Sequence, residues 1–340
     1  MTITNNQIEG TIFGSAIGDG FGYPTEFCSF EEILERWPPI GPQEPEGTII
    51  RVTDDTQMAL AVGAALMNSG DRLFEQEVFA NELIRAFVRW LNDPQNNRAP
   101  GMTCLSACER LERNIPWLEA TARHSKGCGA NMRVMPVALL IAKGYSLEEI
   151  AQLAQLQSAI THAHPTALAA SEITAIAIAM LLQHTPPNDL LEALIDHAQK
   201  QQSVYHEALL GELWQRPSID SPDIYIKLGW EEILYSLDRV LGSLPNYQDG
   251  HDPCRFTGEG WIAEEAFATA LLCFLYSPED AVAILRRSVA SSGDSDSIGC
   301  IAGALAGAYL GIDAFPSDWV NRIEYHQELT SLSQHFFSYQ

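Results

Sequence analysis

The chain has 340 residues, of which 46% are hydrophobic and 19% are charged, a composition typical of folded globular proteins rather than of disordered ones. Its 44 acidic residues outnumber its 20 lysines and arginines, which gives a formal net charge of −24. Because phosphate backbones are bound by clusters of basic residues, this charge argues against general nucleic-acid binding, whereas it permits binding of divalent cations.

The start of the chain, residues 2–6, is polar and lacks the basic segment and the apolar core of a secretory signal. The seven cysteines are odd in number and include no Cys-x-x-Cys pair, so neither a disulfide framework nor a zinc cluster is expected. These features predict a cytoplasmic protein.

The first predicted helix carries a glycine at every fourth position, and so does a predicted helix near the C-terminus. The two sets are Gly10, Gly14, Gly18 and Gly22, and Gly299, Gly303, Gly307 and Gly311. Each set lines one helical face. Glycine inside a helix costs about 1 kcal/mol relative to alanine, which favours faces where another backbone approaches closely. We predict that these two helices are neighbours in the core.

Helical signals recur along the whole chain, and runs of alternating β-branched and polar residues do not, so an all-α fold is predicted. Ser29 and Ser146 are each followed three residues later by glutamate, the spacing of a capping box at a helix start. Pro278, at the expected first helical position after Ser277, predicts another start before residues 281–290.

Two apolar stretches, residues 165–182 and 298–310, are interrupted by polar residues or too short to span a bilayer, and they predict buried core helices. Loops are expected near residues 38–47, 94–101 and 245–260, but none has the character of a domain linker. We therefore predict one domain over residues 1–340 and no membrane association.

Two acidic segments enter predicted helices. Residues 53–56 read Thr-Asp-Asp-Thr before a helical run, and residues 293–297 read Gly-Asp-Ser-Asp-Ser before another. Asp54 with Gln57 has capping-box spacing, so helix capping is as good an explanation as metal binding for the first segment alone. Both segments together hold more oxygen donors than caps require, which favours a metal site.

The ligand chemistry of such a site points to a hard cation. Magnesium and manganese prefer oxygen ligands, whereas zinc more often uses histidine or cysteine, which these segments lack. The spacing of the acids also excludes an EF-hand calcium loop. A shared magnesium or manganese site therefore requires the two segments to meet in the fold.

Four segments in this order resemble the ADP-ribosylglycohydrolase family, which includes dinitrogenase reductase-activating glycohydrolases, ADP-ribosyl-acceptor hydrolases and crystallin J1 proteins. They are residues 10–26, 53–56, 127–133 and 292–299, with Thr161 and His162 between the last two. The resemblance covers most of the chain. It implies a compact orthogonal bundle of α-helices with a cleft for ADP-ribose and two Mg²⁺ or Mn²⁺ ions at its base.

Carried over position by position, the resemblance implies six metal ligands: Thr53, Asp54, Asp55, Asp294, Asp296 and Ser297. The family commonly has threonine where Ser297 stands, and serine keeps the hydroxyl. Glu26 matches a glutamate assigned gating or acid-base roles in relatives. Without the resemblance, Glu26 would be read as a solvated glutamate beside Tyr23 and Phe27.

The resemblance also implies the substrate contacts. The expected contacts are Gly127, Gly129, Ala130, Asn131 and His162, with Trp261 as a candidate for stacking on adenine. Backbone amides at the glycines, and the start of a helix from residue 131, would bind the diphosphate. The structural alternatives are an ordinary turn at residues 127–129, a helix-entry histidine with a structural His164 beside it, and a core tryptophan.

The resemblance implies a metal-dependent hydrolase that cleaves the glycosidic bond between ADP-ribose and an acceptor, with an ADP-ribosylated protein side chain as the first expectation. Asp294 or Glu26 is expected to assist proton transfer while the metals orient the ribose hydroxyls and a water. The alternatives are hydrolysis of a small ADP-ribose conjugate on the same scaffold and a noncatalytic, crystallin J1-like binding or structural role. No motif indicates the acceptor linkage or the oligomeric state.

Overall fold

The computed structural model describes residues 2–75 and 77–337. In this part of the chain there are eighteen α-helices, six short 3-10 helices and no β-strand, which confirms the predicted all-α class. The α-helices are α1 (Asn5–Gly22), α2 (Phe30–Arg36), α3 (Asp54–Ser69), α4 (Val78–Leu91), α5 (Met102–Glu112), α6 (Trp117–Ala120), α7 (Met135–Ala138), α8 (Leu147–Ala159), α9 (Pro165–Leu182), α10 (Pro187–Gln201), α11 (Glu207–Leu210), α12 (Pro222–Ser243), α13 (Cys254–Thr257), α14 (Ala263–Tyr276), α15 (Ala281–Val289), α16 (Ser295–Leu310), α17 (Ser317–Arg322) and α18 (His326–Phe336). The 3-10 helices are η1 (Tyr23–Thr25), η2 (Gly70–Arg72), η3 (Cys128–Ala130), η4 (Leu139–Lys143), η5 (Gly211–Trp214) and η6 (Ile312–Ala314).

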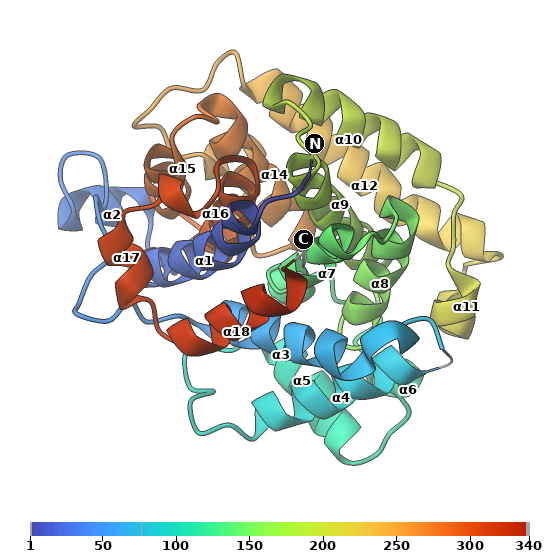
Figure 1. Cartoon of the computed structure of the whole chain (residues 1–340). Helices are drawn as coiled ribbons and strands as arrows, with labels where there is room; N and C mark the ends of the chain where they lie inside the picture. The colour runs from blue at the N-terminus through green and yellow to red at the C-terminus, as the bar shows by residue number, and fades with distance from the viewer. Residues whose placement is uncertain (1, 76, 338–340) are drawn as a thin grey trace.

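The first and sixteenth helices, α1 and α16, pack against each other along their whole length (Figure 1). Their glycine faces meet: a Cβ atom added to Gly18 would lie 1.9 Å from the carbonyl oxygen of Gly299, and one added to Gly303 would lie 1.9 Å from that of Gly14. No side chain fits at either position, because backbone atoms cannot move aside as a flexible side chain can. The predicted pairing of the two glycine faces is confirmed.

A second buried helix, α9, fills the middle of the fold and is surrounded by α7, α8, α10, α12, α14 and α16. Every residue of α9 except Met180 is buried. By length and hydropathy α9 would qualify as a membrane span, but 94% of that stretch lies inside the protein. The prediction of a buried core helix over residues 165–182 is confirmed, and residues 298–308 of α16 are buried as well.

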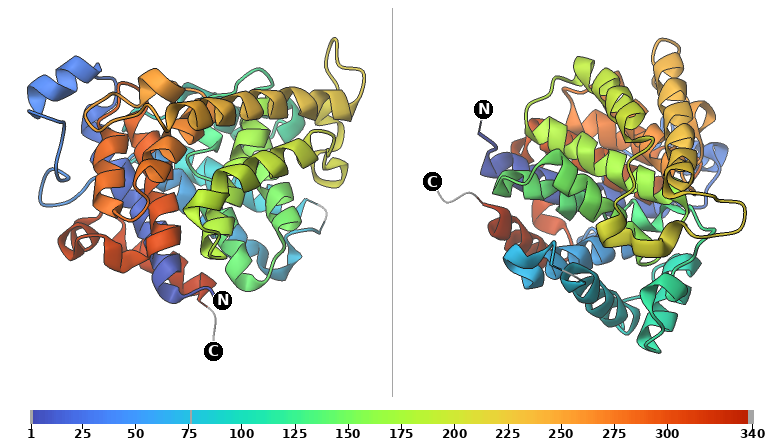
Figure 2. Two further views of the ribbon diagram at one scale, coloured as in Figure 1. Left: turned by 90° about the horizontal axis from the view of Figure 1, so that it is seen from above. Right: turned by 90° about the vertical axis from the view of Figure 1, so that its right-hand side faces the viewer.

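The remaining helices cover this core. Helices α3, α4 and α5 pack in sequence along one side, and α18 lies against both α1 and α3 (Figure 1). In the views of Figure 2, α2 projects at one edge and α12 runs along the outside. The arrangement places the start of α3 and the start of α16 next to the C-terminal half of α1. Asp19 accepts a hydrogen bond from the Thr53 amide, and Gly22 packs against Asp296.

The capping predictions are confirmed at two of three helix starts. Ser29 and Ser146 each accept a hydrogen bond from the backbone amide three residues later, and both capping boxes are complete. The start predicted at Pro278 is wrong: α15 begins at Ala281, where the Asp280 side chain accepts from the Ala283 amide at 2.9 Å. The Ser277 hydroxyl accepts a hydrogen bond from an arginine of α15 instead.

Candidate metal centre

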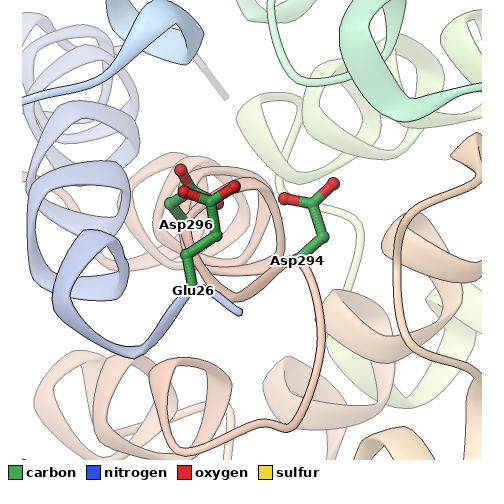
Figure 3. Close-up of side chains that lie close together, drawn as sticks. All are labelled: Glu26, Asp294 and Asp296. Carbon is green, nitrogen blue, oxygen red and sulfur yellow. The ribbon is translucent and has the colours of Figure 1, made fainter. Parts of the chain in front are cut away.

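Three carboxylates converge where α16 begins. Ligand oxygens of Glu26, Asp294 and Asp296 all lie within 4.8 Å of one another, a group that could hold a metal ion. Glu26 directly follows η1 at the end of α1, Asp294 precedes α16, and Asp296 lies in its first turn, so the three side chains face a common space (Figure 3). Asp294 and Asp296 are buried and Glu26 is half-buried. The structure thus brings Glu26 together with two of the six predicted ligands.

The other predicted ligand segment, residues 53–56, forms the start of α3. Asp54 is only 7% exposed and Asp55 only 2%, yet neither caps the helix. Thr53 is the cap residue, and its hydroxyl accepts a hydrogen bond from the Asp55 amide at 3.3 Å. Gln57 donates to the Gln95 carbonyl instead of returning to the helix start. The alternative of an Asp54–Gln57 capping box is therefore wrong.

Asp19, an aspartate of α1, is hydrogen-bonded to the start of α3. It was not predicted as a site residue. Its carboxylate accepts hydrogen bonds from the backbone amide and the hydroxyl of Thr53 and from those of Thr56, all between 2.5 and 3.0 Å. The sequence carries one signal for it. Asp19 is the charged residue of the glycine-rich and mostly apolar second half of α1, residues 12–22, where a buried charge requires partners.

The acidic groups perturb one another across the two segments. Burial and then the charge of Asp296 raise the pKa of Asp54 to about 8 and that of Glu26 to about 9, and the same two causes raise the pKa of Asp19 to about 7. The pKa of Asp55 is raised as well, by burial first and then by Asp296. Because Asp296 acts on residues of both segments, the two acidic entrances share one electrostatic site.

The chemistry of this site fits a divalent cation. Among the residues that the structure describes, no lysine, arginine or histidine forms an ion pair with these carboxylates. The Oδ1 atom of Asp55 is buried and has no hydrogen-bond partner within the described chain. Clustered buried carboxylates are unfavourable unless a positive charge compensates them, and magnesium-type ions prefer such oxygen donors.

Thr53 and Ser297 are the two predicted ligands with a hydroxyl, and these hydroxyls have different neighbours. The hydroxyl of Thr53 donates to Asp19 or to Asp55 and is fully buried. The hydroxyl of Ser297 lies 3.8 Å from the sulfur of Met132, and the backbone amide of Ser297 donates to Asp296 at 3.0 Å. Both hydroxyl oxygens keep acceptor lone pairs.

The glycine segment at residues 127–129 packs beside His162. A Cβ atom added to Gly129 would lie 3.1 Å from the His162 ring. The expected helix from residue 131 is wrong, because only the 3-10 turn η3 is present there and α7 begins at Met135, next to Pro136. The side chains of Ala130 and Asn131 are fully buried, so the exposed part of this segment is glycine backbone.

Hydrogen bonds set the protonation of His162. A guanidinium nitrogen of Arg133 donates to the Thr161 hydroxyl at 2.8 Å, and that hydroxyl lies 2.8 Å from Nδ1 of His162. Thr161 accepts from Arg133 and can donate its own proton to Nδ1, an arrangement in which Nε2 carries the ring hydrogen. Burial and the Arg133 charge lower the pKa of His162 to about 3, so the ring is neutral.

The aromatic residue predicted near the site, Trp261, is 38% exposed and is not a core tryptophan. Its ring stacks on that of Phe27, with centroids 5.2 Å apart and planes 19° apart. Phe27 is 67% exposed and has a left-handed backbone with φ of 63°, immediately after Glu26. The Trp261 carbonyl accepts from the Cys128 amide, so one tryptophan links the Glu26 segment to the glycine segment.

Comparison with known proteins gives one consistent answer. The sequence model of the ADP-ribosylglycohydrolase family matches residues 2–340. The chain is 25% identical to ADP-ribosylhydrolase ARH3 of Homo sapiens over 97% of this chain and 92% of that protein. It is 23% identical to ADP-ribosyl-[dinitrogen reductase] glycohydrolase of Rhodospirillum rubrum, over 93% and 89% of the two chains. A solved structure described as an ADP-ribosylglycohydrolase-related protein complex has the same fold, with a TM-score of 0.65 at 21% identity, covering 98% of this chain and 97% of that one.

Proposed function

Because this chain belongs to the ADP-ribosylglycohydrolase family, we propose that it is a metal-dependent enzyme that hydrolyses the bond between ADP-ribose and an acceptor, first of all an ADP-ribosylated protein side chain. The observation that carries this proposal is a group of buried and half-buried carboxylates that form no ion pair with any described residue. The group is Glu26, Asp294 and Asp296, with Asp54 and Asp55 nearby. A hydrolase of small ADP-ribose conjugates on the same site is the alternative enzyme.

The metal centre that we propose contains two Mg²⁺ or Mn²⁺ ions. The residues that would hold them share oxygen donors at the two helix entrances and are Thr53, Asp54, Asp55, Asp294, Asp296 and Ser297. When bound, the ions would orient the ribose hydroxyls and the attacking water. The protein contributes the fixed directions of these carboxylates, because both entrances pack on α1.

Proton transfer in this proposal belongs to Glu26, with Asp294 as the alternative. Glu26 is the most exposed of the three converging carboxylates, so it reaches both the acidic group and the solvent side. In the metal-free chain, burial and neighbouring charges raise its pKa to about 9. Its place at the solvent side of the acidic group makes it the group that we propose to exchange a proton with the leaving group. The cleavage passes through a cationic, sugar-like transition state that the surrounding carboxylates favour.

The substrate contacts that we propose lie on the segment beside His162. Backbone amides at Gly127 and Gly129 are suited to the diphosphate. Ala130 and Asn131, predicted together with them, are completely buried, so they would act by holding the glycine segment in place. The neutral His162 ring would donate its Nε2 hydrogen toward the ribose. Trp261 would contact the substrate with the ring face that Phe27 does not cover.

The test is a substrate panel assayed with and without Mg²⁺ or Mn²⁺. It should contain proteins ADP-ribosylated on arginine and on serine together with small ADP-ribose conjugates. We expect metal-dependent release of ADP-ribose that is lost in Asp294→Asn and Asp296→Asn but kept in Asp238→Asn, which changes an exposed aspartate of α12. Undiminished turnover in the first two variants would refute the assignment.

A noncatalytic role makes a different prediction. If the wild-type protein releases no ADP-ribose from any member of the panel, yet ADP-ribose and Mg²⁺ raise its melting temperature, the chain is a binding protein. If neither ligand stabilises it, a structural role remains. Our proposal of a cytoplasmic location is tested separately, by cell fractionation.

A further inference from the structure

We propose that Asp19 is a positioning residue that prepares the acidic segment 53–56 for metal binding without itself being a ligand. The inference rests on the metal centre of the proposed function. Asp19 lies in α1, three residues before the helix ends, and it is completely buried. It is separated from the segment that it holds by more than thirty residues of sequence, including all of α2.

Donor groups of Thr53 and Thr56 occupy both carboxylate oxygens of Asp19. Its Oδ1 accepts from the Thr53 amide at 3.0 Å and from the Thr53 hydroxyl at 2.8 Å. Its Oδ2 accepts from the Thr56 amide at 3.0 Å and from the Thr56 hydroxyl at 2.5 Å, and it shares the Thr53 amide at 3.0 Å. A carboxylate offers about four lone-pair sites, and the four donor groups of Thr53 and Thr56 occupy them, which leaves none for a cation.

These hydrogen bonds affect Asp54 and Asp55, the two aspartates between Thr53 and Thr56, because neither is then needed as a helix cap. The first turn of a helix has unpaired amides, which a residue such as Asp54 or Asp55 would normally satisfy. Here Asp19 satisfies the amides of Thr53 and Thr56, while the Thr53 hydroxyl satisfies that of Asp55. Asp55 Oδ1 consequently has no partner in the described chain, and Asp54 has one long contact, 3.4 Å from the Gly101 amide to its Oδ2.

The same helix also holds the second acidic segment, which makes α1 the element that sets the distance between them. The Gly22 carbonyl, three residues beyond Asp19, accepts from the Ser295 hydroxyl at 3.0 Å. A Cβ atom added to Gly22 would lie 2.6 Å from the Cα of Asp296. Residues that orient metal ligands in this way contribute to metal affinity although they do not touch the ion.

The test compares Mn²⁺ affinity in the wild type and in Asp19→Asn, measured by titration calorimetry and by the electron paramagnetic resonance signal of bound Mn²⁺. The variant keeps the shape of the side chain but turns an amide group toward N–H and O–H donors. We expect affinity to fall by roughly 10- to 100-fold, as for other groups that orient metal ligands. Circular dichroism in EDTA should show the same helix content as the wild type.

The matched control is Glu172→Gln. Glu172 is also a fully buried carboxylate, and it accepts from Gln155 Nε2 at 2.5 Å and lies 2.7 Å from His197 Nε2, but it shares no hydrogen bond with the acidic segments. Its replacement should lower the melting temperature while leaving Mn²⁺ affinity near the wild-type value. Wild-type affinity in Asp19→Asn, or an equal loss in both variants, would overturn the assignment.

A milder variant, Thr56→Val, keeps the backbone amide and removes only the hydroxyl that donates to Asp19. It should weaken Mn²⁺ binding less than Asp19→Asn, and the double variant should lose less than the sum, because the two residues act through one contact. If Asp19→Asn does not fold, unchanged affinity in Thr56→Val refutes the inference. A wild type that binds no Mn²⁺ refutes the metal centre and the inference together, whereas one that binds Mn²⁺ but releases no ADP-ribose refutes only the activity.

Discussion

At the scale of single residues, the two acidic entrances differ from ordinary helix caps in what their side chains do. At α3 the capping is divided between Thr53 and Asp19, and at α16 Asp294 precedes the helix without a side-chain capping bond. Buried carboxylates that neither pair with a positive charge nor cap a helix lower the stability of the folded chain. They are retained where function requires them, and stability is lower as a result.

This trade-off gives a prediction for Asp296→Asn. Asp296 is the neighbour whose charge most strongly raises the pKa of Asp54, Asp55 and Asp294 after burial itself. Removing that charge should therefore stabilise the metal-free protein, by roughly 0.5–2 kcal/mol. The same variant should lose the stabilisation that Mg²⁺ gives the wild type.

Chemical denaturation in EDTA and in Mg²⁺ measures both effects. Asp238→Asn removes one negative charge from the exposed surface and should change neither curve. A metal-free Asp296→Asn protein that is less stable than the wild type would contradict the reading of the site as an uncompensated acidic cluster.

At the scale of elements, α1 does three things with one sequence. Its glycine face lets α16 approach, Asp19 holds the entrance of α3, and Glu26 follows directly after its C-terminal turn. The glycine spacing could be read as a packing face because residues four apart share a side of a helix. The partner of Asp19 could not be read, because no local rule links a residue of one helix to the cap of another.

The close approach of α1 and α16 predicts a large effect for Gly18→Ala. The new methyl group would meet the Gly299 carbonyl at 1.9 Å, so the helices must separate, at a cost of roughly 1–3 kcal/mol or more. Gly242→Ala is the matched change, since Gly242 also lies in a helix but has no atom within 4 Å of the added carbon. That variant should be neutral or more stable by about 0.4–1 kcal/mol. Thermal unfolding of the two variants decides the question, and equal stabilities would contradict the packing that the structure shows.

At the scale of the whole molecule, the acidic site couples stability to pH. The folded metal-free chain has carboxyl groups with pKa values raised to about 7, 8 and 9 at Asp19, Asp54 and Glu26, whereas unfolded carboxyls titrate near 4. Between these limits the folded state binds more protons than the unfolded state. Stability contributed by these groups is therefore fully present at low pH and is lost as the pH rises through the folded pKa values.

We expect the melting temperature in EDTA to fall as the pH rises from about 5 to about 9. Stabilisation by Mg²⁺ should grow over the same range, because ligands must lose their protons to bind the ion. Thermal unfolding with and without Mg²⁺ across this range measures both trends. The difference between wild type and Asp296→Asn isolates the site from histidines that titrate elsewhere, and a difference that does not vary with pH would contradict the prediction.

Much of the fold was readable from the sequence because it depends on local patterns. Helical periodicity predicted the all-α class, serine with glutamate three residues later predicted two helix starts, and apolar length predicted the buried α9. The two wrongly predicted helix starts also have causes in nearby residues. Asp280 replaced Ser277 as the cap of α15, and Pro136 accompanies a later start of α7 than expected. The assignment of residues 1–340 to one domain stays a prediction.

The sequence by itself determined which residue types stand at the two acidic entrances, that glycine faces line α1 and α16, and which family the motifs resemble. The tertiary structure alone decided that Asp19 relieves Asp54 and Asp55 of capping, that Glu26 meets Asp294 and Asp296, and that Trp261 stacks on Phe27. The physical reason is the separation along the chain of the residues that interact. Caps and periodicity act within one or two turns of a chain, whereas these contacts join side chains from distant segments, whose positions are set only by how the helices pack.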